Sequence, residues 1–86
     1  MPLKYEVTGY DRKTEALVAV YDVPAQRIST IKKIAGVAPT DDGLGSYPLN
    51  FDQVFAIAKV LNNTIEIENL DFFLEAYAEG DQPAVR

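Results

Sequence analysis

Two strand-like segments, separated only by a short polar turn, constrain the fold of this chain most strongly. Residues 3–10 alternate apolar and polar side chains, which is typical of a half-buried strand. Residues 15–23 are more continuously apolar, as expected for an interior strand that is covered on much of both faces. Because only residues 11–14 separate these segments, the sequence predicts an antiparallel hairpin.

A first helix is predicted over residues 24–35. Ile28, Ile31 and Ile34 recur at helical spacing and form one apolar stripe. The proline that opens this segment suits a first helical turn, where its missing N–H needs no partner, and Gly36 is a natural stop.

A second helix is predicted to begin at Asn50. Asn50 and Gln53 match a capping box, in which each side chain accepts a hydrogen bond from the other's backbone N–H. Val54, Ala58 and Leu61 then lie on one apolar stripe, and the two asparagines that follow end the helix.

The remaining segments are less regular. Residues 37–49 contain two prolines and two glycines and are predicted to form an irregular loop. Residues 64–68 alternate in the manner of a short strand. Residues 70–79 fit both a period of two and a helical stripe. We interpret them as a strand, because a hairpin alone is a poor platform for a core and a third strand completes it.

The sequence therefore predicts one α+β domain over residues 1–86. We expect a small antiparallel β-sheet, with elements in the order β-β-α-α-β and two helices packed on one face. A length of 86 residues and a hydrophobic content of 48% suffice for a single core. Residues 80–86 are expected to form a flexible tail.

The residue inventory excludes several kinds of chemistry. The chain contains no cysteine and no histidine, which excludes Ser–His and Cys–His hydrolases and argues against a zinc site. Asp41 and Asp42 precede glycines, but the alternating oxygen ligands and closing glutamate of an EF-hand are missing. Paired carboxylates could do acid–base work in a cleft, yet solvated surface carboxylates are the simpler interpretation. We therefore expect no enzymatic activity, no cofactor and no metal.

Charge is distributed unevenly along the chain. Residues 1–37 carry six basic and four acidic side chains, a net charge of +2, whereas residues 38–86 carry two basic and nine acidic, a net charge of −7. The second part would repel nucleic acid and attract a basic protein. The chain has neither a signal-peptide pattern nor an apolar run of about 20 residues, so we expect a cytoplasmic location without membrane contact.

Aromatic and acidic residues alternate in the last predicted strand. If Phe72 and Leu74 face the core, then Phe73, Glu75 and Tyr77 share the opposite face with the glutamate that follows. Tyrosine is favoured at interface hot spots, although an ordinary solvated surface is the alternative interpretation. The candidate partner-binding residues are Asp41, Asp42, Tyr47, Glu66, Glu68, Asp71, Phe73, Glu75, Tyr77 and Glu79.

Three stretches carry a resemblance to a known group of proteins. Residues 10–18 (YDRKTEALV), 47–49 (YPL) and 72–77 (FFLEAY) resemble small, acidic, cytoplasmic bacterial immunity proteins of polymorphic toxin and contact-dependent growth inhibition systems. The similarity spans residues 5–79. It implies binding to a cognate toxin, often a nuclease whose groove is basic because it holds phosphates, and neutralisation of that toxin. It assigns no individual binding residue.

Two other classes of function stay open at this point. The toxin-binding interpretation expects a monomer or weak homodimer when the chain is free. The chain could instead be a structural or adaptor subunit that acts as a homo-oligomer through an exposed strand edge beside Phe73 and Tyr77. A small-molecule-binding or enzymatic domain would instead require a deep pocket lined by convergent polar groups.

Overall fold

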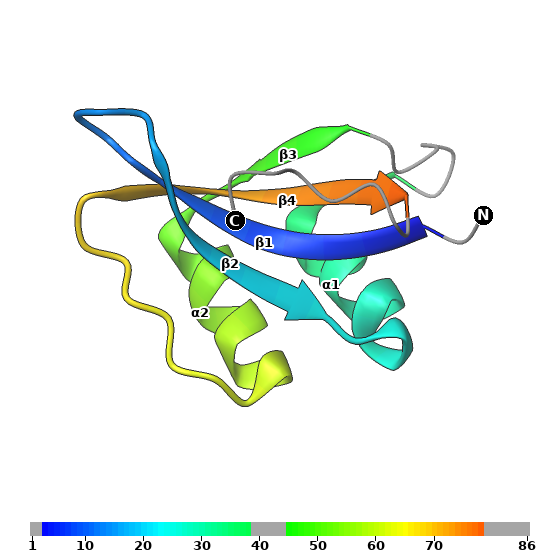
Figure 1. Ribbon diagram of the computed structural model, residues 1–86. Coiled ribbons are helices and arrows are strands. Elements are labelled where there is room, and N and C mark those ends of the chain that lie inside the picture. The colour runs from blue at the N-terminus through cyan, green and yellow to red at the C-terminus, as the bar shows by residue number, and fades with distance from the viewer. Residues whose placement is uncertain (1–2, 39–44, 79–86) are drawn as a thin grey trace.

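A four-stranded antiparallel sheet carries two helices on one of its faces in the computed structural model, which describes residues 3–38 and 45–78 (Figure 1). The elements are β1 (Leu3–Asp11), β2 (Leu17–Val23), a 3₁₀ turn η1 (Ala25–Arg27), α1 (Ile28–Ala35), β3 (Ser46–Leu49), α2 (Phe51–Leu61) and β4 (Leu70–Ala78). The strand order across the sheet is β2-β1-β4-β3. The predicted α+β class, antiparallel sheet and two helices on one face are confirmed.

The strands β1 and β4 form the centre of the sheet. They pair antiparallel over their whole lengths, from Leu3 opposite Ala78 to Asp11 opposite Leu70. The strand interpretation of this last segment is confirmed over its helical alternative. Phe72 and Leu74, two residues apart, are both almost fully buried, so the period of two describes the segment.

The predicted hairpin is confirmed, with β2 paired to the other side of β1. The register shifts by a bulge between Gly9 and Tyr10, where β2 contributes one extra residue. The expectation that β2 is an interior strand is wrong, because β2 is an edge strand and its Val18 side chain is 57% exposed. Its long apolar run therefore does not reflect burial on both faces.

Local sequence signals account for both helices. The first predicted helix starts as the 3₁₀ turn and continues as α1, which ends at Gly36 in the left-handed conformation with φ of 79°. The capping box of α2 is present: Gln53 N donates to Asn50 Oδ1 at 2.8 Å, and Asn50 N donates to Gln53 Oε1 at 2.7 Å. Gln53 Nε2 also donates to the carbonyl of Ile34 at 3.0 Å, which joins the two helices.

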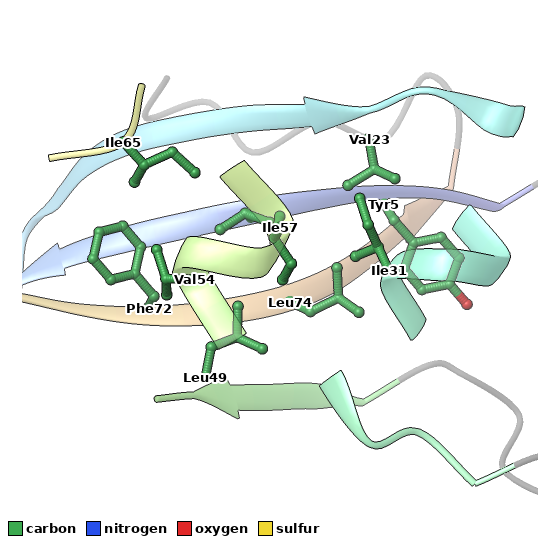
Figure 2. Packing of buried hydrophobic residues seen from close by; sticks show 10 residues of the cluster. Tyr5, Val23, Ile31, Leu49, Val54, Ile57, Ile65, Phe72 and Leu74 are labelled. Carbon is green, nitrogen blue, oxygen red and sulfur yellow. The ribbon is translucent and has the colours of Figure 1, made fainter. Parts of the chain in front are cut away.

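The hydrophobic core lies between the helices and the sheet (Figure 2). Ile31 of α1, Val54 and Ile57 of α2, and Val7 and Leu74 of the sheet are completely buried. The rest of the buried core consists of Tyr5, Val23, Leu49, Ile65 and Phe72. Alternate residues of the central strands thus point toward the helices, as their sequence pattern predicts.

Two segments differ from the prediction. The loop expected over residues 37–49 contains the short strand β3, which pairs with residues 72–75 of β4. Pro48 is compatible with this position because β3 is an edge strand and need not donate a hydrogen bond on its outer side. Residues 64–68 form no strand. They alternate because Ile65 and Ile67 pack against the core, whereas their neighbours are exposed.

The strand that was considered for self-association, which carries Phe73 and Tyr77, is β4, and β4 is not an edge strand of the sheet. Phe73 lies in the sheet interior, since β4 pairs with β1 on one side and with β3 on the other. The pairing with β3 ends at Glu75, so it does not extend to Tyr77. The expected flexible tail, residues 80–86, lies outside the described residues, as do Asp41, Asp42 and Glu79. Neither of the α-helices in residues 3–38 and 45–78 has the length and apolar character that a membrane span requires.

Candidate functional site

The face of the sheet opposite the helices, here called the open face, gathers polar and aromatic side chains from all four strands. No described helix covers it (Figure 1). Because directly paired residues share a face, the register defines its members. They are Lys4, Glu6, Thr8 and Tyr10 of β1, Leu17, Val20 and Asp22 of β2, Ser46 and Pro48 of β3, and Asp71, Phe73, Glu75 and Tyr77 of β4.

Glu75 is the hub of this face. Its Oε1 accepts hydrogen bonds from the hydroxyls of Thr8 and Tyr10, each at 3.1 Å, and its Oε2 accepts one from the Ser46 hydroxyl at 3.0 Å. The donors come from the two strands that flank β4, so the sheet register fixes them around the carboxylate. Glu75 is thereby held in one orientation by three hydroxyl groups.

Tyr10 connects this hub to an aromatic contact. Its ring meets the ring of Phe73 edge to face, with centroids 5.6 Å apart and an interplanar angle of 78°. Partial burial, followed by the negative charge of Glu75 and the hydrogen bond to it, raises the pKa of Tyr10 above its usual value of 10.0. The phenol therefore stays neutral and keeps donating to Glu75 at physiological pH.

A row of carboxyl groups crosses the open face. Glu6 of β1 lies opposite Asp22 of β2 on one side and opposite Glu75 of β4 on the other. Glu6 is only 2% exposed, although it lies on the open face. The Tyr77 hydroxyl donates to Asp22 Oδ1 at 3.4 Å, so its side chain passes over β1 to reach the far strand.

A hollow of about 380 Å³ opens beside the hub. Its lining consists of Tyr10, Asp11, Glu15, Ser46, Asp71, Phe73 and Glu75, which provide four carboxyl groups, two aromatic rings and one aliphatic hydroxyl. At its rim, Arg12 Nε lies 3.0 Å from Asp71 Oδ1 in an ion pair whose two side chains are about half exposed. The wall of the hollow is thus acidic and aromatic together.

The turn that joins β1 to β2 brings Asp11 and Glu15 to this hollow. Asp11 Oδ1 accepts hydrogen bonds from the backbone N–H groups of Lys13 and Thr14 at 2.8 and 2.9 Å. These bonds lower the pKa of Asp11 below its usual value of 3.8, and the bond from Thr14 has the larger effect. Glu15 adopts a positive φ of 62°, which closes the turn.

The structure separates the predicted partner-binding residues into three groups. Asp71, Phe73, Glu75 and Tyr77 lie together on the open face, as the alternation predicted. Tyr47 instead pairs with Leu74 and packs on the helix side of the sheet. Glu66 and Glu68 are exposed in the segment between α2 and β4, and Asp41, Asp42 and Glu79 lie outside the described residues.

Sequence reasoning missed part of the open face. Among the residues that it did not name are Glu6, Thr8, Tyr10, Asp22 and Ser46. The alternation of residues 3–10 already places Thr8 and Tyr10 on the side away from the core, so this signal could have identified them. Ser46 could not be found in this way, because β3 lies in a segment that has no strand periodicity.

Metal ligands do not converge anywhere in residues 3–38 and 45–78, where no group of three or more acidic side chains is close enough to hold an ion. The carboxyl groups around the hollow are therefore spread along its wall.

Comparison with known proteins identifies one family. Residues 4–75 match the model of a family described as a domain of unknown function, DUF7683. This match begins within β1 and ends at Glu75 within β4, so it covers most of β1, the first six residues of β4 and the hub of the open face. No curated protein and no solved structure matches the chain.

Proposed function

We propose that this chain, which belongs to the DUF7683 family, binds a basic protein through the open face of its sheet and thereby neutralises it. The observation that carries the proposal is the combination of Glu75, fixed by three hydroxyl donors, with the neighbouring rings of Tyr10 and Phe73. Aromatic anchors beside charged groups are typical of protein interfaces.

The charge of the open face favours a basic partner. Its accessible acidic residues are Asp22, Asp71 and Glu75, of which Asp71 is paired with Arg12, whereas Glu6 is buried and Lys4 is the one basic member. The whole chain carries a formal net charge of −5. A surface of this sign accelerates encounter with a positively charged partner and disfavours nucleic acid, whose phosphates carry the same sign.

The rigidity of the face supports binding. Thr8 is 1% exposed and belongs to the central strand β1, and Glu75 belongs to its neighbour β4, so both are held by the backbone hydrogen bonds of the sheet. A group that is already ordered before association loses little further entropy on binding. A preorganised acidic and aromatic surface therefore suits tight recognition.

The resemblance to immunity proteins suggests what kind of partner this is. In the proposed mechanism, the partner is the cognate toxin of a polymorphic toxin system. Its active-site groove is basic because it holds phosphates, and the open face covers that groove as a mimic of nucleic acid. The chain itself performs no catalysis in this mechanism. A cytoplasmic location belongs to the proposal, and the absence of cysteine fits a reducing compartment.

The proposal is tested with the protein encoded directly upstream of this chain. Binding is measured by isothermal titration calorimetry, and neutralisation by growth of cells that express both proteins. The key variant carries Asp71→Asn and Glu75→Gln. A matched control carries Glu66→Gln and Glu68→Gln, which removes the same number of charges from the exposed segment between α2 and β4.

The open-face variant should bind at least about tenfold more weakly, because interface charge pairs contribute roughly 1.5 kcal/mol or more. The control variant should change the affinity less than about threefold, because its two charges act on the partner only over a long, screened distance. Equal effects of the two variants, or an upstream protein that neither binds nor is neutralised, would refute the proposal.

A second candidate function is self-association through the outer edge of β2. This strand has no neighbour on that side among the described elements, and it lacks the lysines and prolines that usually protect an edge. Light scattering at micromolar concentration tests it. A stable dimer that Val18→Lys converts to a monomer would favour this function over toxin binding.

A further inference from the structure

We infer that the hollow beside Glu75 receives a single arginine side chain of the partner and acts as the anchor point of the interface. This inference rests on the proposed function, because it specifies which group of the basic partner the open face recognises. It is carried by three observations: the layout of the hollow, the acceptor site of Glu75 that no described residue occupies, and the way the chain binds its own Arg12.

The layout suits a long, flat cation. Asp71, Phe73 and Glu75 occupy alternate positions of β4, so all three side chains leave the same face of the sheet. At a rise of about 3.3 Å per residue, the two acidic positions lie roughly 13 Å apart, with the aromatic ring between them. A guanidinium lying over this ring would have a carboxylate toward each end and a π face beneath it.

Glu75 retains capacity for one more donor. A carboxylate offers about four acceptor sites, two on each oxygen. Thr8 and Tyr10 occupy both sites of Oε1, whereas Ser46 occupies one site of Oε2. Among the described residues, nothing else donates to Oε2. An incoming N–H group can therefore bind there without displacing any of the three hydroxyls.

Arg12 shows the same recognition within the chain. It lies at a smaller hollow of about 210 Å³ on the other side of Asp71, where its Nε contacts Asp71 Oδ1 at 3.0 Å and its guanidinium lies 5.6 Å from the centroid of the Phe51 ring. Asp71 lines both hollows. The larger hollow repeats this arrangement of carboxylate and aromatic ring but has no cation of the described chain in its lining.

Arginine fits this hollow better than lysine. The guanidinium is planar, stacks on aromatic faces and is weakly hydrated, whereas the lysine ammonium is a compact and strongly hydrated charge. A site that combines aromatic rings with separated carboxylates favours the planar group, because its five N–H donors point in several directions at once. Phe73 and Tyr10 provide this aromatic wall.

The experiment is an NMR titration of the isotope-labelled full chain with N-acetyl-arginine N-methylamide. The lysine and citrulline derivatives serve as comparison probes, since citrulline keeps the shape of arginine but is uncharged. Saturable shifts are expected for the backbone amides of residues 8–10, 46 and 71–75, with a dissociation constant on the order of 10 mM for one small group. Residues 54–60 of α2 provide the internal reference.

The lysine derivative should bind at least about threefold more weakly, and citrulline should give no saturable shift at these amides. Glu75→Gln should weaken arginine binding at least about fivefold, whereas Glu68→Gln should leave it unchanged. Absence of saturable shifts with the arginine derivative overturns the inference, as does equal binding of citrulline. If the upstream protein still binds through the open face in that case, only the anchor assignment fails and the proposed function stands.

Discussion

Tyr10 and Glu75 are 65 positions apart in the sequence, yet the Tyr10 hydroxyl donates a hydrogen bond to Glu75 Oε1 at 3.1 Å. The contact exists because β1 and β4 are antiparallel neighbours at the centre of the sheet. It places a phenol against a carboxylate on the open face.

The pH dependence of stability should report on Tyr10. Its folded-state pKa is raised above 10.0, so the folded state favours the protonated phenol. The resulting stability is fully present below pH 10 and is lost as the pH rises through the folded pKa. Denaturant unfolding between pH 8 and 11 should show a steeper loss above pH 10 for the native chain than for Tyr10→Phe. Identical pH profiles would contradict this prediction.

Removal of the Glu75 carboxylate should destabilise the domain. Glu75→Ala leaves the hydroxyls of Thr8, Tyr10 and Ser46 without this acceptor, and we expect a loss of about 1–3 kcal/mol in the free energy of unfolding. Glu75→Gln keeps an acceptor oxygen and should lose less. Urea denaturation measures both changes. Glu68→Ala, at an exposed position outside the network, is the control and should stay within about 0.5 kcal/mol of the native chain.

Asp11 should stabilise the β1–β2 turn only while it is charged. Its pKa is lowered by the backbone N–H groups of Thr14 and Lys13, so its contribution is present above the usual value of 3.8 and is lost as the pH falls through the folded pKa. Asp11→Ala should lower the melting temperature at pH 7. The difference from the native chain should shrink at pH 2, and a difference that is independent of pH would refute this account.

Gly9 should not tolerate a side chain. A Cβ atom at this position would lie 3.0 Å from Phe72 Cε1 and 3.3 Å from Ala19 Cβ. Because Phe72 is 2% exposed and packed in the core, it cannot move freely, and we expect Gly9→Ala to cost about 1–3 kcal/mol. Thermal unfolding measures this cost. The double variant with Ala19→Gly should recover part of it, since one of the three close contacts, which include Leu70 Cδ1 at 3.3 Å, is then relieved.

The elements with strong local signals were predictable from the sequence. The capping box at Asn50 fixed the start of α2, and the turn at Asp11 identified the hairpin. The strand β3 escaped prediction because it is only four residues long and contains Pro48, so its strand character comes from pairing with β4 and not from its own residues. Likewise, the apolar run of β2 gave no indication that it lies at the sheet edge.

The candidate site was predictable only in part, for the same reason. Alternation placed Phe73, Glu75 and Tyr77 on one face, which the structure bears out. The hydroxyl groups of Thr8 and Ser46 that hold Glu75 come from other strands, and their proximity depends on a strand order that no local pattern encodes. Tyr47, another of the candidate residues, pairs with Leu74, and this pairing places it on the helix side of the sheet, away from the open face.

The central position of β4 has a consequence for how the chain folds during synthesis. The ribosome releases β1 first, but the partner that flanks it at the centre of the sheet, β4, emerges only after both helices have been made. Until then, the β1–β2 hairpin carries an open edge that can pair with other nascent chains. Native assembly of the sheet must therefore wait for β4, and its rate should be limited by closure of this long-range contact.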